Sequence, residues 1–414
     1  MSRIDELIAE LCPEGVEYKA IGDFGELVRG NGMPKSDFVE SGVGCIHYGQ
    51  IYTYYGIWTI ETISFVSAAK AEKFAKVDPG DLIITNTSEN LDDVCKAVAW
   101  LGDTQIVTGG HATVLKHDQD PKYLSYYLQT PNFFVEKKRH ATGTKVIDVS
   151  AKSLAKIKIP VPPLEVQREI VKVLDTFTKL EAELEAELEA RRRQYKYYRD
   201  ALLSFDERMS GASKQASKQA LWATLNEVAT FKYGFTAKAA NAGEFRFIRI
   251  TDITDGGKLS PDDAKYVNST EGASDYLVQR GDVLMARTGA TFGKTVLIAD
   301  DMPAVYASFL IRIRLDETEI LPNYYWHFAQ SSLYWQQANS LVSMGGQPQF
   351  NANVLKDIRL PIPSMEEQER IVAILNKFDA LVNDLSSGLP AEIKARRQQY
   401  AHYRDRLLTF KEAA

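Results

Sequence analysis

A glycine-rich stretch, RTGATFGKTVLI, runs from Arg287 to Ile298 and has the composition of a loop that holds nucleotide phosphates. Such a loop needs four residues between its first glycine and the Gly-Lys pair, and it precedes a helix whose amides bind the phosphate. Only three residues separate Gly289 from Gly293, and TVLIA after Lys294 predicts a strand. The equivalent stretch of the first half, TNTSENLDDVCKAV, contains no glycine. We therefore predict a strand–loop–strand connection rather than a site of nucleotide hydrolysis.

The remaining reactive side chains form no recognisable catalytic or metal-binding pattern. The three cysteines, Cys12, Cys45 and Cys95, are odd in number and far apart, as expected of reduced thiols. His111 and His117 share one short segment without a metal-ligand pattern beside them. The sequence contains no cofactor-binding glycine signature, nucleophile elbow or Asn-Pro-Pro-aromatic methylation motif. We predict a chain that is not an enzyme and binds no metal or cofactor of its own.

Polar side chains that can donate to or accept from base edges gather in the predicted loops of both halves. Reading DNA needs such groups, together with donors to phosphate. In the first half the candidates are Arg29, Lys35, His47, Tyr48, Gln50, Asn86, Thr87, Ser88, His111, Thr144 and Lys145. In the second half they are Lys232, Tyr233, Lys238, Arg249, Thr251, Asp252, Arg287, Thr288, Lys294, Ser308, Gln347 and Gln349. Each is also an ordinary polar loop residue, so the DNA hypothesis rests on their gathering.

Two segments of the chain each occur twice in similar form. IPVPPLEVQREIVKVL (159–174) returns as LPIPSMEEQERIVAIL (360–375), with seven of sixteen positions identical. ARRRQYKYYRDALLSF (190–205) returns as ARRQQYAHYRDRLLTF (395–410), with eleven of sixteen identical. A globule of faintly matching sequence precedes each copy. The order of variable globule and repeated segment, occurring twice, indicates an internal duplication with pseudo-twofold character.

The repeated segments are predicted to be long helices that pair with each other as an antiparallel coiled coil. Each follows a Pro-x-Pro stretch and carries acidic residues suited to a first helical turn. The alternative is two amphipathic helices, each packed on its own globule. The apolar stripe of the first copy comprises Ile170, Leu174, Phe177, Leu180, Leu184, Leu188, Tyr195, Tyr198 and Leu202. That of the second comprises Ile371, Leu375, Phe378, Leu381, Leu385, Leu389, Ile393, Tyr400, Tyr403 and Leu407.

The two copies differ where the second has gained four residues. KLEAELEAELEA (179–190) in the first copy contains no helix breaker, which predicts one continuous helix. LSSGLPAEI (385–393) in the second contains Gly388 and Pro390, which predict a break near 387–390. Each LEAE unit adds about 6 Å of helix at 1.5 Å per residue.

The globules show the pattern of mixed α/β domains. Apolar runs such as DLIIT, FRFIRI and FLIRIRL predict strands, and PKYLSYYLQT and LPNYYWHFAQ predict aromatic-rich helices. We predict an α+β protein made of a globule at 1–155, a repeated long helix within 156–208, a linker at 209–220, a second globule at 221–356 and the second repeated segment at 357–414.

The overall charge and the hydrophobic pattern restrict the possible environment of the chain. The formal net charge is −6, which argues against a chain that coats nucleic acid by bulk attraction. There is no run of eighteen apolar residues, and the acidic start MSRIDELIAELCPEG is unlike a signal peptide. We expect a cytoplasmic protein with no membrane partner.

The duplicated order, the IPxPxxEQxxIV motif with its variant IPVPPLEVQREIV, and the tails QYKYYRDALLSF and QYAHYRDRLLTF resemble the specificity subunit of type I restriction-modification systems. The LEAE repeat resembles the subgroup with tandem four-residue repeats in its central region. The resemblance implies two target-recognition domains that read a bipartite site in double-stranded DNA. It also implies docking of two methyltransferase subunits and of restriction (translocase) subunits, with S-adenosylmethionine, ATP and Mg expected on those partners. Val166 departs from the motif, since the second copy has Glu367 there.

Two other classes of function compete with this interpretation. One is an enzyme, either a nucleotide hydrolase that uses Lys294 or a self-sufficient methyltransferase. The other is a coiled-coil scaffold with no role in DNA binding, for which two identical globules would suffice. The globules have diverged while the helical segments have not, and two different half-sites would require that difference.

Overall fold

The computed structural model describes residues 3–207, 219–268, 273–342, 350–384 and 386–413. The chain divides into two compact units, Met1–Ala182 with Ala395–Ala414 and Glu183–Lys394, which we call the first and second units. The predicted linker at 209–220 lies outside the described residues up to 218, whereas Gln219 and Ala220 already belong to strand β16. In the described part of the chain, no helix is both long and apolar enough to cross a membrane.

The first unit is built mainly of two five-stranded sheets with the orders β2-β12-β8-β10-β5 and β3-β6-β4-β11-β7. The strands are β1 (Tyr18–Ala20), β2 (Gly25–Arg29), β3 (Phe38–Val39), β4 (Val43–Ile46), β5 (Trp58–Thr59), β6 (Ser64–Val66), β7 (Ala75–Val77), β8 (Leu82–Thr85), β9 (Thr87–Ser88), β10 (Ala97–Trp100), β11 (Ile106–Thr108), β12 (Ala112–His117), β13 (Ile147–Asp148) and β14 (Lys158–Pro160). The helices are α1 (Arg3–Leu11), α2 (Ile21–Phe24), η1 (Lys35–Asp37), α3 (Tyr48–Thr53), α4 (Ala68–Ala71), α5 (Pro121–Tyr127), α6 (Pro131–His140) and α7 (Ala151–Leu154).

The second unit repeats this plan with smaller sheets, β17-β23-β20-β21 and β19-β18-β22, beside the three-stranded sheet β15-β16-β24. Its strands are β15 (Asp206–Glu207), β16 (Gln219–Thr224), β17 (Ala229–Tyr233), β18 (Phe245–Ile248), β19 (Tyr266–Val267), β20 (Val283–Ala286), β21 (Thr295–Leu297), β22 (Ala304–Tyr306), β23 (Leu310–Leu315) and β24 (Arg359–Ile362). Its short helices are α9 (Leu225–Val228), η2 (Ile250–Asp252), η3 (Ala273–Tyr276), η4 (Gly289–Thr291), α10 (Pro322–Phe328), α11 (Ser332–Leu341) and α12 (Ala352–Leu355).

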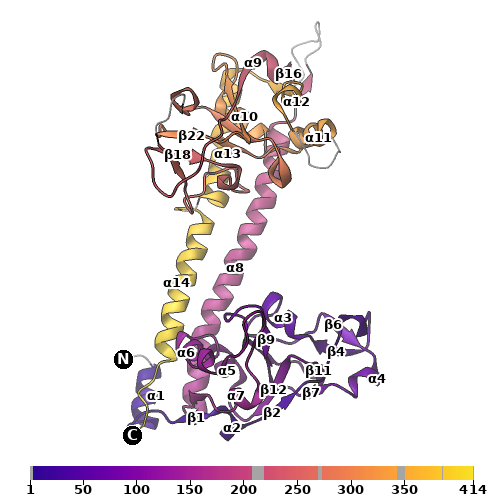
Figure 1. The fold of residues 1–414 in the computed structure, drawn as a ribbon, viewed down its shortest axis with the longest axis vertical. Helices are drawn as coiled ribbons and strands as arrows, with labels where there is room; N and C mark the ends of the chain where they lie inside the picture. Colours follow the sequence, from indigo (N-terminus) through magenta and orange to yellow (C-terminus); the bar gives the residue numbers. More distant parts are fainter. Residues whose placement is uncertain (1–2, 208–218, 269–272, 343–349, 385, 414) are drawn as a thin grey trace. The chain divides into compact units, whose positions relative to one another are not determined.

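The first repeated segment forms one uninterrupted helix, α8 (Leu164–Leu202), which belongs to both units (Figure 1). The second forms two helices, α13 (Met365–Asn383) and α14 (Leu389–Leu407). The Asp384 carboxylate accepts from the backbone N–H groups of Ser386 and Ser387, which ends α13. A Cβ on Gly388 would lie 2.5 Å from the Ala380 carbonyl oxygen, so this close approach of backbone to backbone needs glycine.

The repeated segments exchange partners between the units. In the first unit, Phe177 of α8 stacks on Tyr403 of α14, and Glu181 forms an ion pair with Arg397. Because the residue numbers increase along one helix as they decrease along the other, the two segments are antiparallel. In the second unit, Phe378 of α13 stacks on Tyr195 and Tyr198 of α8. The tail of the second repeated segment, in α14, therefore completes the first unit. The tail of the first repeated segment, at the end of α8, completes the second unit.

The alternative of helices packed on their own globules also describes part of the structure. Ile170 and Leu174 of α8 lie in the main core of the first unit, and Ile371 and Leu375 of α13 lie in that of the second. The first half of each repeated segment thus packs on its own globule, while its tail packs in the other unit.

Most predicted stripe positions are buried or half-buried, with a few exceptions. Leu381 is 37% exposed, whereas its neighbour Val382 is buried in the core of the second unit, so Val382 takes the inward position that was predicted for Leu381. Tyr198 and Tyr403 are about as exposed, at 40% and 36%, and cover their phenylalanine partners from the solvent side. Leu385 lies outside the described residues.

Candidate nucleic-acid interface

Backbone hydrogen bonds place the predicted reading loops of the two units at matching positions. The Asn86 N–H donates to the His111 carbonyl at 2.7 Å, and the Arg287 N–H donates to the Phe309 carbonyl at 3.0 Å. In return, the Asn86 carbonyl accepts from Val149 and the Arg287 carbonyl from Phe350, both at 2.9 Å. Asn86 therefore corresponds to Arg287, and His111 corresponds to Phe309.

A second pair of matching positions lies at the start of α3 and of η2. The His47 N–H donates to the Gln50 side chain at 2.9 Å, and the Arg249 N–H donates to the Asp252 carboxylate at 2.8 Å. In both cases the side chain three residues downstream accepts a hydrogen bond from this backbone N–H, which closes the first turn of a short helix. The same backbone frame thus holds His47 in one unit and Arg249 in the other.

In the first unit, three of the predicted residues form one aromatic cluster. The Tyr48 ring lies 4.4 Å from that of His47 and 5.1 Å from that of His111, measured between ring centroids. Burial lowers the pKa of His47, and the neighbouring Lys35 and His111 lower it further, which favours the neutral form of the ring. The His111 side chain is exposed and its backbone has φ of 68°, a left-handed conformation that costs energy in a residue other than glycine. Such strain at an exposed side chain is typical of functional sites.

Asn86 lies beneath this cluster and is used within the domain. It is 1% exposed; its amide Nδ2 donates to the Val149 carbonyl at 2.8 Å and its Oδ1 accepts from the Thr113 hydroxyl at 2.8 Å. Thr87 and Ser88 are also buried, since β9 pairs with β13. The structure therefore assigns these three predicted reading residues to the support of the loop, because burial removes them from the surface.

A short hairpin carries two other predicted residues to the surface. Thr142 and Asp148 exchange backbone hydrogen bonds at 2.8 and 2.9 Å, and Gly143 adopts φ of 96° in the turn between them. Thr144 and Lys145 are exposed at the tip of this hairpin. The β13 half of the hairpin rests on Thr87 and Ser88, so the tip is held beside the Asn86 loop.

In the second unit, Arg287 is held at the edge of the hairpin between β20 and β21. Its Nε donates to the Ser308 carbonyl at 3.0 Å, and its guanidinium carbon lies 5.4 Å from the Tyr233 ring and 5.6 Å from the Phe309 ring. Tyr233 and Phe309 are 42% and 51% exposed. An arginine fixed between two exposed aromatic rings keeps its NH groups in a defined plane, as bidentate contact with a base edge requires.

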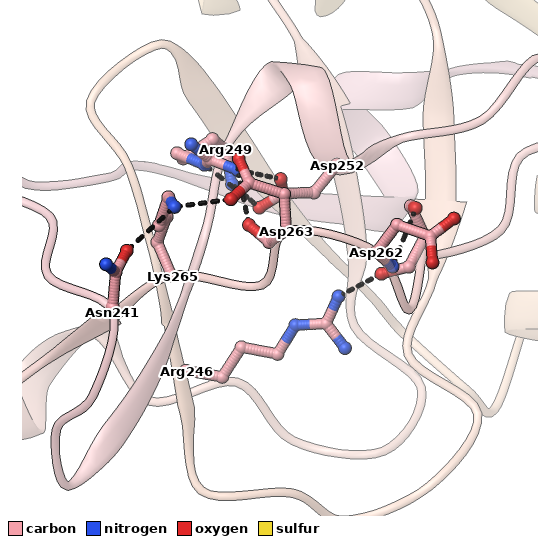
Figure 2. A network of polar contacts seen from close by, with 8 residues as sticks. Asn241, Arg246, Arg249, Asp252, Asp262, Asp263 and Lys265 are labelled. Carbon is pink, nitrogen blue, oxygen red and sulfur yellow. Dashed lines mark hydrogen bonds and ion pairs between the residues drawn. The ribbon is translucent and has the colours of Figure 1, made fainter. Parts of the chain in front are cut away.

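Arg249 and Asp252 belong to an ion-pair network rather than to a free surface (Figure 2). The Arg249 NH2 group donates to the Asp252 carboxylate at 2.6 Å and to the Asp263 carbonyl at 3.0 Å. Lys265 joins Asp263 to Asn241 in the same network. Asp252 is 2% exposed, so its predicted role in reading bases is replaced by a role in fixing Arg249.

The other predicted residues fall into four groups. Arg29, Lys35, Lys238 and Thr251 are exposed, whereas Gln50 donates to the Ser64 hydroxyl and Thr288 is half-buried. Two lysines are held by partners within the second unit: Lys232 by the Asp275 carbonyl and Lys294 by the Asp255 carboxylate. Gln347 and Gln349 lie outside the described residues.

The connection around Lys294 is a strand, a single 3-10 turn and a strand, as predicted, so no helix follows Lys294. Phe309, the counterpart of His111, is not among the predicted reading residues. Aligning the strands β12 and β23 would have identified it, because each of the two residues stands just before its strand. Among the residues that the structure describes, no group of three or more His, Cys, Asp or Glu side chains is placed to hold a metal ion.

The family profile described as "Type I restriction modification DNA specificity domain" matches residues 13–190 and again 222–395, which is most of the chain and one match for each copy. The chain belongs to the type I restriction–modification DNA specificity family. This specificity subunit is 34% identical over 317 residues to a putative type I restriction enzyme specificity subunit of Haemophilus influenzae, covering 72% of this chain and 75% of that protein. It is 30% identical over 312 residues to the EcoR124I/EcoR124II specificity subunit of Escherichia coli, covering 70% of each chain.

Solved structures share the fold of this specificity subunit. The type I restriction-modification S subunit from M. genitalium superposes with a TM-score of 0.55 at 14% sequence identity, covering 95% of this chain and 96% of that chain. A chain of a type I R-M system gives a TM-score of 0.62 at 16% identity, covering 95% of this chain and 97% of that chain. The two α+β globules and the long helices are therefore the fold of type I specificity subunits.

Proposed function

We propose that each unit of this specificity subunit reads one half of a bipartite target in double-stranded DNA. The observation that carries the proposal is the shared backbone frame at the reading loops. At matching positions that are both exposed, the first unit presents His111 and the second presents Phe309. Two readers with the same frame and different side chains suit two half-sites of different sequence.

In the second unit, Arg287 is the principal reader of base edges. Its guanidinium is oriented by the Ser308 carbonyl and by two aromatic rings, and a bidentate contact of arginine with guanine O6 and N7 is a common specific contact in the major groove. In the first unit, the exposed side chain of His111 takes this place, with the half-buried Tyr48 ring packed against it. Lys145, at the tip of the neighbouring hairpin, supplies a phosphate contact.

The chemistry resides on partner subunits in this proposal. Two methyltransferase subunits dock on the repeated helical segments and supply S-adenosylmethionine, and restriction subunits supply ATP and Mg. The complex acts in the cytoplasm. The partner exchange between the repeated segments supports this arrangement, since it gives both units similar helical surfaces for two copies of one partner.

Methylation mapping tests the proposal. The chain is expressed with its methyltransferase, and methylated adenines are located in the host DNA. We expect two half-sites separated by bases that are not read, and we expect Arg287→Ala to change one half-site alone. Methylation without any sequence preference would reject the proposal.

A further inference from the structure

A cavity of about 250 Å³ lies in the second unit at the Lys294 end of the β20–β21 hairpin. It is formed by the end of α8, the loop before β19, the start of β21 and the connection between α10 and α11. Its lining residues are Arg199, Thr254, Asp255, Gly257, Lys294, Thr295, Ala329, Gln330 and Trp335. Two of these carry positive charge and one carries negative charge.

The arginine of this cavity lacks the partner that its counterpart in the first unit has. Arg404, which corresponds to Arg199, donates to the adjacent Asp405 carboxylate at 2.7 and 2.9 Å. Asp200, which corresponds to Asp405, is occupied elsewhere: it accepts from the Ser332 N–H at 2.8 Å and from the Ser332 hydroxyl at 2.6 Å.

Arg199 is consequently left with weak partners inside the protein. It donates to the Gln330 side chain at 3.4 Å, its guanidinium lies 5.0 Å from the Tyr195 ring, and its buried Nε has no hydrogen-bond partner in the described structure. An arginine with an unsatisfied N–H group beside a cavity is suited to an anion.

The strand β21 brings two further donors to the same cavity. Thr295 is 2% exposed, and its hydroxyl has no hydrogen-bond partner within the described residues. The preceding residue, Lys294, forms an ion pair with Asp255, whose side chain is 94% exposed. Because that carboxylate lies almost wholly in solvent, an anion can displace it from Lys294 at small cost.

The loop that closes the cavity requires glycine at one position. Gly257 adopts φ of 70°, and a Cβ there would lie 2.9 Å from the Thr295 carbonyl oxygen. The Gly257 N–H donates to the Thr254 carbonyl at 3.0 Å, which closes this turn. This wall of the cavity is therefore a defined turn that is closed by its own backbone hydrogen bond.

We propose that this cavity binds a phosphate group through Arg199, Lys294, Thr295 and Gln330. Its volume is below the roughly 300–1,000 Å³ of pockets that enclose whole small-molecule ligands, so it suits one phosphate group better than a complete nucleotide. The phosphate comes either from a DNA backbone, in which case the inference rests on the proposed function, or from a free anion. Asp255 competes with the phosphate for Lys294.

The test uses three variants of the full chain. Arg199→Gln removes a cation, Asp255→Asn removes the competing carboxylate at an exposed position that the fold does not need, and Arg404→Gln is the matched control in the first unit. Binding of inorganic phosphate is followed by the fluorescence of Trp335, with Trp335→Phe to identify its signal. Binding of the chain with its methyltransferase to duplex DNA is measured over a range of salt concentrations.

We expect Asp255→Asn to tighten inorganic phosphate binding about two- to fivefold, the range of an exposed ion pair, and Arg199→Gln to abolish it. If the phosphate comes from DNA, Arg199→Gln also lowers the slope of log affinity against log salt by about 0.9, with both half-sites unchanged. An unchanged slope together with anion binding supports a free anion as the ligand.

If neither variant changes either measurement, or Arg404→Gln changes them equally, the proposal is overturned. Loss of sequence preference in the wild-type complex would reject the proposed function, whereas the measured binding of inorganic phosphate would still stand.

Discussion

Phe378 of α13 stacks on Tyr198 of α8, with ring centroids 5.3 Å apart and ring planes at 23°. Phe177 of α8 stacks on Tyr403 of α14 with the same separation and an angle of 24°. Each pair joins the first half of one repeated segment to the tail of the other. The near-identity of the two tails therefore has a structural cause, because each tail must stack a tyrosine on the phenylalanine of the other repeated segment.

The stacking of these phenylalanines on the tail tyrosines gives a first prediction for stability. Phe378→Ala should destabilise the second unit by about 2–4 kcal/mol, because it removes a partly buried ring and two stacking contacts. Phe177→Ala should do the same to the first unit. Thermal unfolding combined with hydrogen exchange in α5 and α10 measures the size of the loss and its location. The control is Leu381→Ala, a 37% exposed position at which we expect less than about 1 kcal/mol. Equal losses for Leu381→Ala and Phe378→Ala would contradict the packing described here.

A buried histidine makes the second unit sensitive to acid. His327 is fully buried; its Nε2 lies 2.8 Å from the Asn376 Oδ1 and its Nδ1 lies 3.1 Å from the Tyr195 hydroxyl. This geometry suits a neutral ring that donates from Nε2. Burial lowers the pKa of His327 from 6.5 to about 4. At the same position the first unit has Tyr126, which donates to Asp175 at 2.8 Å.

The pKa of His327 fixes the pH window of this effect. Between pH 6.5 and about 4 the unfolded chain binds a proton at His327 that the folded chain does not, so unfolding becomes easier as the pH falls through that window. The stabilisation, about 3 kcal/mol from the pKa difference, is complete above pH 6.5. Urea unfolding of wild type and His327→Gln at several pH values measures it. We expect the variant to lose less stability than wild type between pH 6.5 and 4; parallel curves would rule the effect out.

The reading loops predict separate changes in the two half-sites. Arg287→Ala should relax one half-site by about 1–3 kcal/mol of discrimination, the usual worth of a bidentate base contact. His111→Ala should alter the other half-site and leave the first intact. Methylation mapping with each variant shows which positions lose their preference. If both variants changed the same half-site, the assignment of one half-site to each unit would be wrong.

The length of α8 predicts the gap between the half-sites. Deleting Leu180–Glu183 removes one LEAE unit and about 6 Å of helix, close to two base pairs at about 3.4 Å each. We expect the unread gap to shrink by one or two base pairs while both half-sites keep their sequences. The control is a substitution of the same four residues by alanine, which keeps the helix length and should keep the gap. An unchanged gap after the deletion would show that α8 does not set the spacing.

Sequence patterns were sufficient for the duplication, for strands in apolar runs such as β8, β18 and β23, and for the continuous helix α8. They could not explain why Gln167 and Gln368 are identical in the two copies. Each is fully buried, accepts from the backbone N–H of Asp120 or Leu321 at the start of α5 or α10, and donates to the carbonyl of the Pro-x-Pro stretch. The bonds from Asp120 and Leu321 join residues 47 positions apart, and no local pattern encodes such a distance.

The reading loops show the same limit. Residue type alone placed Asn86 and Asp252 among the readers, although both are buried and hold their loops together. It also omitted Phe309, since an exposed phenylalanine is indistinguishable in sequence from a core residue. Burial and hydrogen bonding across the domain separate supporting residues from presented ones, and both depend on the tertiary fold.

The central claim is that one chain reads two different half-sites, one with each unit. The most direct test maps methylated adenines in cells that express this chain with its methyltransferase, before and after residues 221–356 are replaced by those of a relative with another specificity. We predict a bipartite site in which only one half-site changes on replacement, while the other half-site is retained. A site that stayed the same, or in which both half-sites changed together, would contradict the claim.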